Sequence, residues 1–315
     1  MTPAIFISAA YGGEGWQPRQ THTRDELGAI WAACGQDSEW KPLKGVLLHR
    51  PGPEILLADE PNAVQMLAPV DLARLQAQHD ALAQAYCDAG VSVFYVDPDE
   101  TPPPNLMFVA DLLFMTPEGA ILARPASRVR AGEERFIARR LAALGVPILH
   151  SVHGRATFEG ADAMWLTPER ALVADGLRTN PEGWTQVART LQELGVETIP
   201  VGLPFGAMHL MGTLRIVDRD LAIAWPGRTP FAAVRALREQ GYVVHFLPDE
   251  GEARQGFALN VVTLGPRRVL MPAGNPITQR FFQGLGIECI TVEVDELAKA
   301  AGAIGCLTGA LYREG

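Results

Sequence analysis

The sequence predicts an α/β fold of five similar units arranged in a closed ring, and three observations lead to this prediction. One local pattern recurs five times: a short apolar strand, a turn, an amphipathic helix that ends in glycine, and a second β-branched strand. A chemically distinctive residue follows each copy at the same phase, so that successive residues of this kind are about 50 positions apart. Such a period is typical of rings or arrays. Each unit has one helix, which is too few to cover both faces of a flat parallel sheet. The phased residues are Asp111, Glu159, His209, Asn260 and Cys306.

The N-terminal part of the chain does not fit the period. Residues 1–38 contain Gly, Trp and charged residues, and we predict an N-terminal extension with a short helix near residues 25–33. The repeat runs through the rest of the chain, so residues 39–315 are predicted to form a single catalytic domain.

The first unit opens with a strand at residues 46–48 that ends at a Pro-Gly pair. A helix is predicted at residues 71–89, because its apolar positions fall on one face at the 3.6-residue period. Gly90 then supplies a left-handed cap that ends this helix.

The other four units repeat the scheme. Their opening strands are each broken by Gly or Pro into a turn. Helices are predicted near residues 133–144, 181–194, 231–240 and 276–285, ending at Gly145, Gly195, Gly241 and Gly286. A second and a third strand follow each helix, so every unit reads strand, helix, strand, strand. Five such wedges, with helices outside and strands inside, would each be buried against their neighbours.

The segments between the second and third strands are long and rich in Gly and Pro, as in SVHGRATFEG and VGLPFGAMH. Such loops in a compact domain usually carry function. Because all five lie at one phase, a ring would bring them to one end of its axis. The sequence therefore predicts a reaction centre there.

The composition excludes several classes of protein. Of 315 residues, 48% are hydrophobic and 20% charged, as in ordinary globular proteins, and the net charge of −9 argues against nucleic acid or an anionic membrane as a partner. The chain has no apolar run of about 18 residues that would span a membrane, and no recognisable secretory signal. Its four cysteines form no CxxC pair or Cys/His cluster, so we expect a protein of the reducing cytoplasm without a zinc site. The expected partner is a small-molecule substrate, and a homo-oligomer stays an alternative to a monomer.

Cys306 differs from the other three cysteines in its surroundings. A lone cysteine is usually a buried structural residue, the interpretation that suits Cys34, Cys87 and Cys289. Around Cys306 lie several small residues in AGAIGCLTG, which are predicted to leave room for a ligand. We therefore interpret Cys306 as a candidate nucleophile.

His209 is the only histidine at the shared phase, and Glu159 holds the matching place one unit earlier. A cysteine, a histidine that moves protons and an acid that orients the histidine form an activated-nucleophile arrangement. In FEGAD a second carboxylate, Asp162, follows Glu159 by three positions and is predicted to bind substrate or backbone groups. Asp111 is predicted to lie inside an apolar strand, where it requires a cationic ligand or an internal partner.

Four segments carry a resemblance to a known superfamily: FVAD, FEGAD, MHLMG and GCLT, in this order. They resemble the guanidino-group modifying enzymes, among them arginine deiminase, dimethylarginine dimethylaminohydrolase and the amidinotransferases. The resemblance covers about residues 39–313 and implies the pentein fold, a five-bladed α/β-propeller. It also implies a nucleophilic Cys306, a proton-transferring His209, and carboxylates at Asp111 and Glu159 that serve a guanidino substrate without a metal or an organic cofactor.

The chain departs from this pattern at Met211. Deiminases and amidinotransferases resemble each other in having an acid two residues after the histidine, where this chain has HLM. A missing acid disfavours free arginine and favours a substituted guanidine or a less cationic amidine-like heterocycle. Asn260 is counted among the substrate-binding candidates with its role left open. Four arginines are candidates for binding a substrate carboxylate or for solvated turns: Arg124, Arg128, Arg130 and Arg178.

Three functions follow from these observations. The leading one is a cysteine hydrolase that cleaves a C–N bond at a guanidine- or amidine-type carbon through a covalent Cys306 intermediate. The second is an amidinotransferase, in which an amine instead of water resolves the same intermediate. The third is a non-catalytic propeller that binds a ligand.

Overall fold

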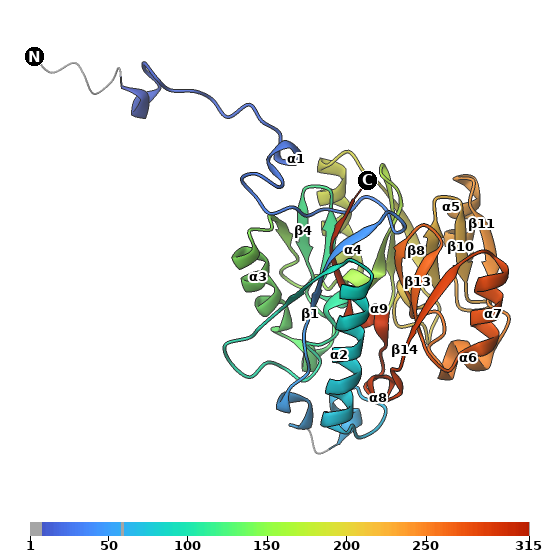
Figure 1. Ribbon diagram of the computed structural model, residues 1–315. Helices are drawn as coiled ribbons and strands as arrows, with labels where there is room; N and C mark the ends of the chain where they lie inside the picture. Colours follow the sequence, from blue (N-terminus) through green and yellow to red (C-terminus); the bar gives the residue numbers. More distant parts are fainter. Residues whose placement is uncertain (1–7, 58–59, 315) are drawn as a thin grey trace, which may run out of the picture.

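The computed structural model describes residues 8–57 and 60–314, which form a mixed α/β fold of five three-stranded sheets (Figure 1). In spatial strand order the sheets are β15 (Gly309–Arg313), β1 (Leu43–Leu48), β2 (Ser92–Tyr95); β3 (Leu113–Thr116), β4 (Gly119–Leu122), β5 (Ile148–Ser151); β6 (Ala163–Thr167), β7 (Arg170–Asp175), β8 (Glu197–Gly202); β11 (Val243–Phe246), β10 (Leu221–Ala224), β9 (Leu214–Asp218); and β12 (Val262–Gly265), β13 (Arg268–Pro272), β14 (Glu288–Val292).

One long helix accompanies each sheet, and shorter helices lie between the strands. The long helices are α2 (Leu72–Asp88), α3 (Glu133–Leu144), α4 (Pro181–Glu193), α5 (Phe231–Glu239) and α7 (Pro276–Gly284). The short α-helices are α1 (Thr23–Glu26), α6 (Glu250–Gln255), α8 (Asp295–Ala298) and α9 (Ile304–Leu307). The 3-10 helices are η1 (Ala9–Tyr11), η2 (Pro53–Leu56), η3 (Pro61–Val64), η5 (Arg128–Arg130), η4 (Val109–Asp111), η6 (Gly160–Asp162) and η7 (Leu210–Gly212). No helix among the described residues is long and apolar enough to cross a bilayer.

The predicted order of strand, helix, strand, strand is observed, but the sheets are assembled across unit boundaries. In each sheet the middle strand pairs in parallel with the strand after the long helix and antiparallel with a third strand. That third strand comes from the end of the preceding unit. The last one, β15, pairs with β1, so the two ends of the repeat share the first sheet.

The five helix-ending glycines have the predicted left-handed conformation, with φ between 77° and 85°. Without a Cβ, glycine adopts this conformation at no steric cost, which ends each helix and turns the chain into the next strand. The helix predicted at residues 25–33 is wrong in length, because α1 ends at Glu26. The backbone N–H groups of Ala29, Ile30 and Trp31 all donate to the Glu26 carbonyl, and Gly28 has φ +80°, so the chain turns there.

Consecutive sheets contact one another. β15 contacts β3, β9 contacts β12, and β12 contacts β1, which brings the fifth sheet against the first. Between them the short helices also meet: α9 with η4, η4 with η6, and η6 with η7. The short helices that precede the third strands therefore converge in one region.

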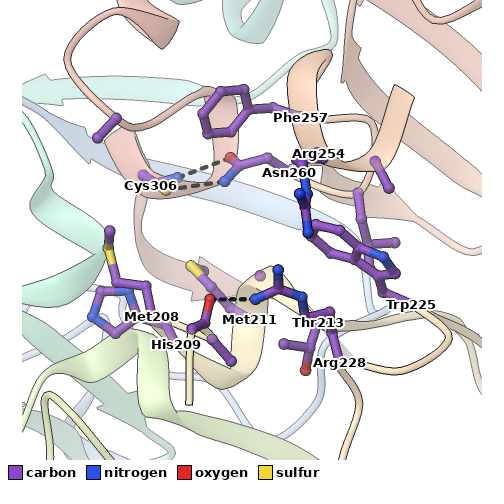
Figure 2. A pocket seen from close by; sticks show the side chains of 16 residues that line it. Met208, His209, Met211, Thr213, Trp225, Arg228, Arg254, Phe257, Asn260 and Cys306 are labelled. Carbon is purple, nitrogen blue, oxygen red and sulfur yellow. Dashed lines mark hydrogen bonds between the residues drawn. The ribbon is translucent and has the colours of Figure 1, made fainter. Parts of the chain in front are cut away.

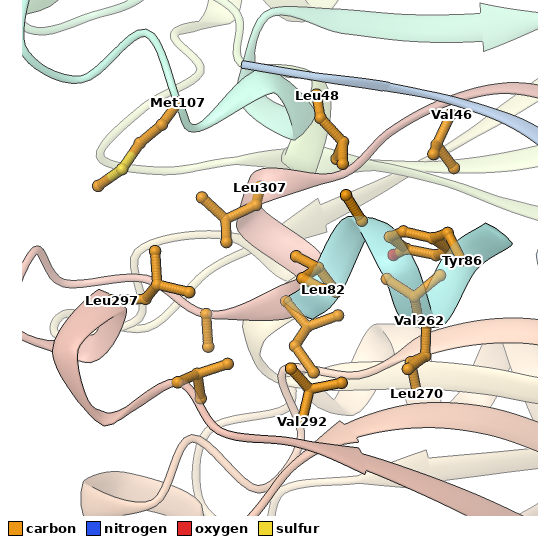
Figure 3. Packing of buried hydrophobic residues seen from close by; sticks show 14 of the residues in the cluster. Val46, Leu48, Leu82, Tyr86, Met107, Val262, Leu270, Val292, Leu297 and Leu307 are labelled. Carbon is orange, nitrogen blue, oxygen red and sulfur yellow. The ribbon is translucent and has the colours of Figure 1, made fainter. Parts of the chain in front are cut away.

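The largest hydrophobic cluster lies where α2 covers the junction of the first and fifth sheets (Figure 3). Leu82 of α2 packs there with Val262 and Val292, and burial of each such side chain stabilises the fold by about 1.5–3 kcal/mol. From the same helix, the Tyr86 hydroxyl forms a 2.7 Å hydrogen bond with the hydroxyl of Thr308. Thr308 in turn donates to the carbonyl of Ile304 at 2.7 Å, so α2 supports the short helix α9 that contains Cys306.

Candidate functional site

The five phased residues lie on the converging short segments. Asp111 ends η4, Glu159 and His209 directly precede η6 and η7, Asn260 precedes β12, and Cys306 lies in α9. The prediction that Asp111 lies inside a strand is wrong, because the chain forms a 3-10 turn before β3 begins. The turn directs this carboxylate toward its counterparts from the other units.

His209 and Glu159 form a buried pair. Glu159 Oε2 accepts a hydrogen bond of 2.7 Å from His209 Nε2, and His209 Nδ1 lies 3.7 Å from Asp111 Oδ1. Burial disfavours the charged imidazole, but Asp111 and Glu159 outweigh it and raise the pKa of His209 to about 9. Burial likewise acts against the Glu159 carboxylate, but His209, Arg130 and Arg178 lower its pKa to about 2. His209 is therefore held as a proton donor near neutral pH.

The pKa of His209 predicts a pH-dependent stability. When a group has a higher pKa in the folded than in the unfolded chain, its protonation stabilises the fold. This contribution is complete at a pH below the pKa of the unfolded chain, and it is lost as the pH rises through the pKa of the folded chain. Between about pH 6.5 and 9.5 we expect the free energy of unfolding to fall, by an amount on the order of 2 kcal/mol. Urea unfolding across this range would measure it, and the fall should be smaller in a His209→Gln variant. An equal fall in both proteins would contradict the assignment.

Arg130 forms buried ion pairs with the carboxylates of the site. Its Nη1 donates to Asp111 Oδ2 at 2.5 Å and lies 3.5 Å from Glu159 Oε2, and its Nε donates to Glu133 at 2.9 Å. Although burial disfavours the guanidinium charge, these three carboxylates hold the pKa of Arg130 above its usual value. The contacts favour an internal bracing role for Arg130 over the predicted contact with substrate.

The other three candidate arginines differ in burial and in their hydrogen-bond partners. Arg178 is buried and its Nη1 lies 3.3 Å from Glu159 Oε1, so it braces the same carboxylate. Arg124 donates to the carbonyl of Ala156 at 3.0 Å, and Arg128 is exposed. Of these three, Arg178 is the one that lines a cavity together with Cys306.

Asp162 is buried and bonded within the protein. One oxygen accepts from the Thr179 hydroxyl at 2.7 Å and the other from the Leu210 backbone N–H at 3.2 Å. Burial raises the pKa of Asp162 to about 6. Since Leu210 follows His209, these bonds favour the backbone-binding alternative for Asp162, which would help to place His209.

Asn260 clamps the turn that carries Cys306. Its Nδ2 donates to Cys306 Sγ at 3.0 Å, while its Oδ1 accepts from the backbone N–H groups of Gly305 at 2.7 Å and Cys306 at 3.3 Å. Burial and the Asp111 charge raise the pKa of the Cys306 thiol, and the Asn260 side chain acts in the opposite direction. The contacts point to a role for Asn260 in holding the thiol, in place of the open role left by the sequence.

The small residues around Cys306 are predicted to leave room for a ligand, and Ala301 lines a cavity beside Cys306, but the glycines themselves leave no such space. A Cβ on Gly302 would lie 2.3 Å from the Phe108 ring, and one on Gly309 would lie 2.7 Å from Val109. The space beside these glycines is filled by protein side chains. Glycine is required here because neighbouring segments pack closely against the Cys306 turn.

Cys306 opens onto a cavity of about 230 Å³ (Figure 2). Cys306 and Asn260 lie on one wall, and Met208, His209 and Met211 on another. The lining also includes residues that sequence reasoning missed, from the turn after β10 and from the segment around α6: Trp225, Arg228, Arg254 and Phe257. Phe257 lies on the side of Asn260, and Arg228 on the side of Met211 (Figure 2). Among the described residues that line this cavity there is no carboxylate.

A second, smaller cavity of about 30 Å³ shares His209, Cys306, Met208 and Ala301 with the first. It is polar on its other side, where its lining includes Asn105, Gln65, Asp111, Arg130 and Arg178. The buried Oδ1 of Asp111 has no hydrogen-bond partner in the described part of the chain. Cys306 and His209 therefore lie between a polar recess and a larger, mostly apolar chamber.

Asp111, Glu159 and His209 also have ligand atoms within 4.8 Å of one another, a spacing compatible with a metal ion. However, Glu159 and His209 are hydrogen-bonded to each other, and the Arg130 guanidinium pairs with Asp111 and approaches Glu159. A cation thus already neutralises these carboxylates, which favours an ion-pair network over a metal centre.

Comparison with known proteins identifies relatives of the chain, although no family model matches it. It is 26% identical over 238 residues to dimethylarginine dimethylaminohydrolase from Pseudomonas aeruginosa, covering 76% of this chain and 89% of that protein. The enzyme of the same name from Streptomyces coelicolor is 28% identical over 267 residues, or 85% of this chain and 96% of that protein. Weaker matches are an arginine deiminase from Rhodococcus erythropolis and, over 34% of this chain, a glycine amidinotransferase from Danio rerio.

Solved structures show the same fold. The Pseudomonas aeruginosa dimethylarginine dimethylaminohydrolase in complex with citrulline aligns with a TM-score of 0.72 and 23% identity, covering 87% of this chain and all of that one. An amidinotransferase of the saxitoxin pathway from Microseira wollei aligns with a TM-score of 0.70 and 15% identity, over 90% and 98% of the two chains. The predicted resemblance to the guanidino-group modifying enzymes is confirmed. The predicted enzyme class is confirmed as well, because the homologues of this chain include hydrolases that act on C–N bonds.

Proposed function

We propose that this chain, whose homologues modify guanidino groups, is a metal-independent cysteine hydrolase that cleaves a C–N bond at a guanidine- or amidine-type carbon. One observation carries the proposal: Cys306 lines the same cavities as His209, and His209 is held by a buried carboxylate. A thiol, a proton-transferring imidazole and an orienting acid are the parts that covalent catalysis requires.

The proposed reaction proceeds in two halves. The Cys306 thiolate adds to the electron-poor carbon, and the C–N bond to the leaving amine breaks as the His209 imidazolium gives that amine a proton. The neutral imidazole then takes a proton from water, whose oxygen adds to the carbon of the thioether. The C–S bond breaks, which releases the product and regenerates the thiolate and imidazolium.

The lining of the cavities indicates which substrates fit. Asp111 lines the polar recess, and its Oδ1 accepts no hydrogen bond from the described residues, which suits a substrate N–H group. The larger chamber combines Met211 and Trp225 with the cation of Arg228. Because a carboxylate is absent from the described lining of this chamber, we propose a substituted guanidine or a planar amidine-like N-heterocycle in preference to free arginine.

The proposal also includes the closure of the ring, the bounds of the catalytic domain, the cellular location and the oligomeric state. The contacts of the fifth sheet with the first support a closed five-bladed α/β-propeller, with residues 39–315 as one catalytic domain and residues 1–38 as an extension. All four cysteines are free, which suits the reducing cytoplasm expected from the sequence. A homo-oligomer stays an alternative to a monomer.

The experiment that tests the function is a substrate screen. Purified protein would be incubated with substituted guanidines and amidine-like heterocycles, and release of ammonia, amine or nitrite would be measured with wild-type and Cys306→Ala protein. Turnover that depends on Cys306 supports the proposal. Turnover of an identified substrate that survives the substitution contradicts it.

Two alternatives are separated by related measurements. An amidinotransferase is favoured by the Microseira wollei and Danio rerio relatives, and trapping a labelled Cys306 intermediate and offering it water or candidate amines would identify the acceptor. A non-catalytic binding protein would have a Cys306 no more reactive toward alkylating reagents than Cys34 or Cys87.

Met211 offers a test of substrate charge. Met211→Asp places a carboxylate in the chamber, which should favour a guanidinium substrate over a neutral amidine. We expect the ratio of kcat/KM for the two substrates to shift by about tenfold, or about 1.4 kcal/mol. Met211→Leu is the apolar control and should leave the ratio unchanged. An unchanged ratio in Met211→Asp would show that Met211 does not set the charge preference.

A further inference from the structure

A buried arginine lies directly behind the nucleophile and lines neither cavity of the site. Arg215, in β9, donates from Nε to the Leu259 carbonyl at 3.1 Å, one residue before Asn260. A Cβ on Gly305 would lie 2.2 Å from Arg215 Nη2 and 3.0 Å from Asn260 Oδ1. The guanidinium therefore packs against the backbone of the residue that precedes Cys306, and only glycine permits this approach.

The charge of Arg215 lacks an ordinary partner. Within the described part of the chain no carboxylate forms an ion pair with it, and its buried Nη2 has no hydrogen-bond partner. Burying an unpaired charge is costly, so such groups are normally compensated. Burial lowers the pKa of Arg215, and the ionised Cys306 opposes this more than Glu39 does.

The surroundings of Cys306, in contrast, disfavour a negative charge on its sulfur. Burial and the Asp111 carboxylate both act against the thiolate that the proposed chemistry requires. Asn260 supplies one neutral donor to Sγ. A full positive charge is the stronger means of favouring a thiolate.

We propose that Arg215 is the counter-cation of the Cys306 thiolate, acting across the Gly305–Cys306 turn. When the Sγ proton leaves to solvent, the new negative charge on sulfur is partnered by the buried guanidinium, so ionisation of the thiol relieves the unpaired charge. Arg215 is thus a positioning residue that neither touches substrate nor transfers a proton. The inference rests on the proposed role of Cys306 as the nucleophile.

The test is the pH profile of Cys306 alkylation by iodoacetamide, read by mass spectrometry of the Cys306 peptide in a Cys87→Ser background. Arg215→Met removes the charge and keeps an unbranched side chain. We expect its profile to move to higher pH, with alkylation near neutral pH slowed at least about tenfold, because each pKa unit changes the thiolate fraction tenfold. Arg215→Lys, whose charge ends one bond short of the guanidinium nitrogens, should shift in the same direction by less.

Arg313→Met is the matched control. Arg313 is also buried, donates to the Lys41 carbonyl at 2.7 Å, and is not among the groups that act on Cys306, so its loss should leave the profile unchanged.

A folded Arg215→Met protein with the parent profile would overturn the inference. If Arg215→Met does not fold, the equally neutral Arg215→Gln replaces it, and a folded Arg215→Gln protein with the parent profile overturns the inference. A Cys306 no more reactive than Cys34 in the parent protein would instead overturn the proposed function, so the two failures are distinguishable.

Discussion

Replacing Cys306 by alanine is expected to reduce turnover by at least about 10⁴-fold, because the covalent route is lost with the nucleophile. The same variant should still bind substrate, since Asp111, Met211 and Trp225 keep their places around the cavities. Single-turnover kinetics and a binding titration with the same substrate would measure the two effects separately.

Cys87→Ala is the control for a general effect of losing a thiol. Cys87 is exposed in α2 and lies outside both cavities, so this variant should keep full activity. Comparable losses in the two variants would indicate damage to the fold and not the loss of a nucleophile. Full turnover by Cys306→Ala would contradict the mechanism.

Replacing Glu159 by glutamine is expected to damage both activity and stability. The amide is nearly the same shape but carries no charge, so the pKa of His209 should fall from about 9 toward its ordinary value. Asp111 still favours the imidazolium, but a smaller fraction of His209 would hold its proton near neutral pH and be able to protonate the leaving amine, which should lower kcat by roughly 10²-fold. The alkaline limb of the kcat profile should also move to lower pH.

The stability effect has a separate cause. Arg130 and Arg178 both pair with Glu159, and breaking a buried ion pair on one side costs about 3–5 kcal/mol. Glu54→Gln is the matched control, because Glu54 is also buried and bonded to a histidine, with Oε1 3.2 Å from His49 Nε2, but lies outside both cavities. It should lose stability and keep kcat and its pH profile. A Glu159→Gln profile that matches wild type would show that Glu159 does not control His209.

Local patterns explain why much of the fold was predictable. Helix periodicity and a glycine cap depend on residues that are near in sequence, so the five long helices and their left-handed glycines were expected and are observed. The helix near residues 25–33 was overestimated because Gly28 turns the chain, and the strand around Asp111 was overestimated because a 3-10 turn precedes β3. Boundaries of this kind depend on hydrogen bonds that side-chain periodicity does not report.

The candidate site was predictable in its members but not in its contacts. The shared phase identified Asp111, Glu159, His209, Asn260 and Cys306 as one group, and the structure brings them together in two connected sets. Arg228 and Phe257 were missed because they line the cavity from segments without a distinctive motif. The bracing of Glu159 by Arg130 and Arg178 was missed because turn arginines have no sequence feature that separates a buried ion pair from a solvated charge.

The sequence by itself determined the order of elements, the five-fold period and the chemistry offered at each repeat, because these follow from spacing and residue type. Only the tertiary structure decided that β15 completes the first sheet with β1, that Asn260 holds Cys306 across 46 positions, and that Arg215 lies unpaired behind the nucleophile. Each of these depends on which distant segments meet in space. The charged groups that meet there, together with burial, decide the direction of each pKa shift: neighbouring charges outweigh burial at His209 and Glu159.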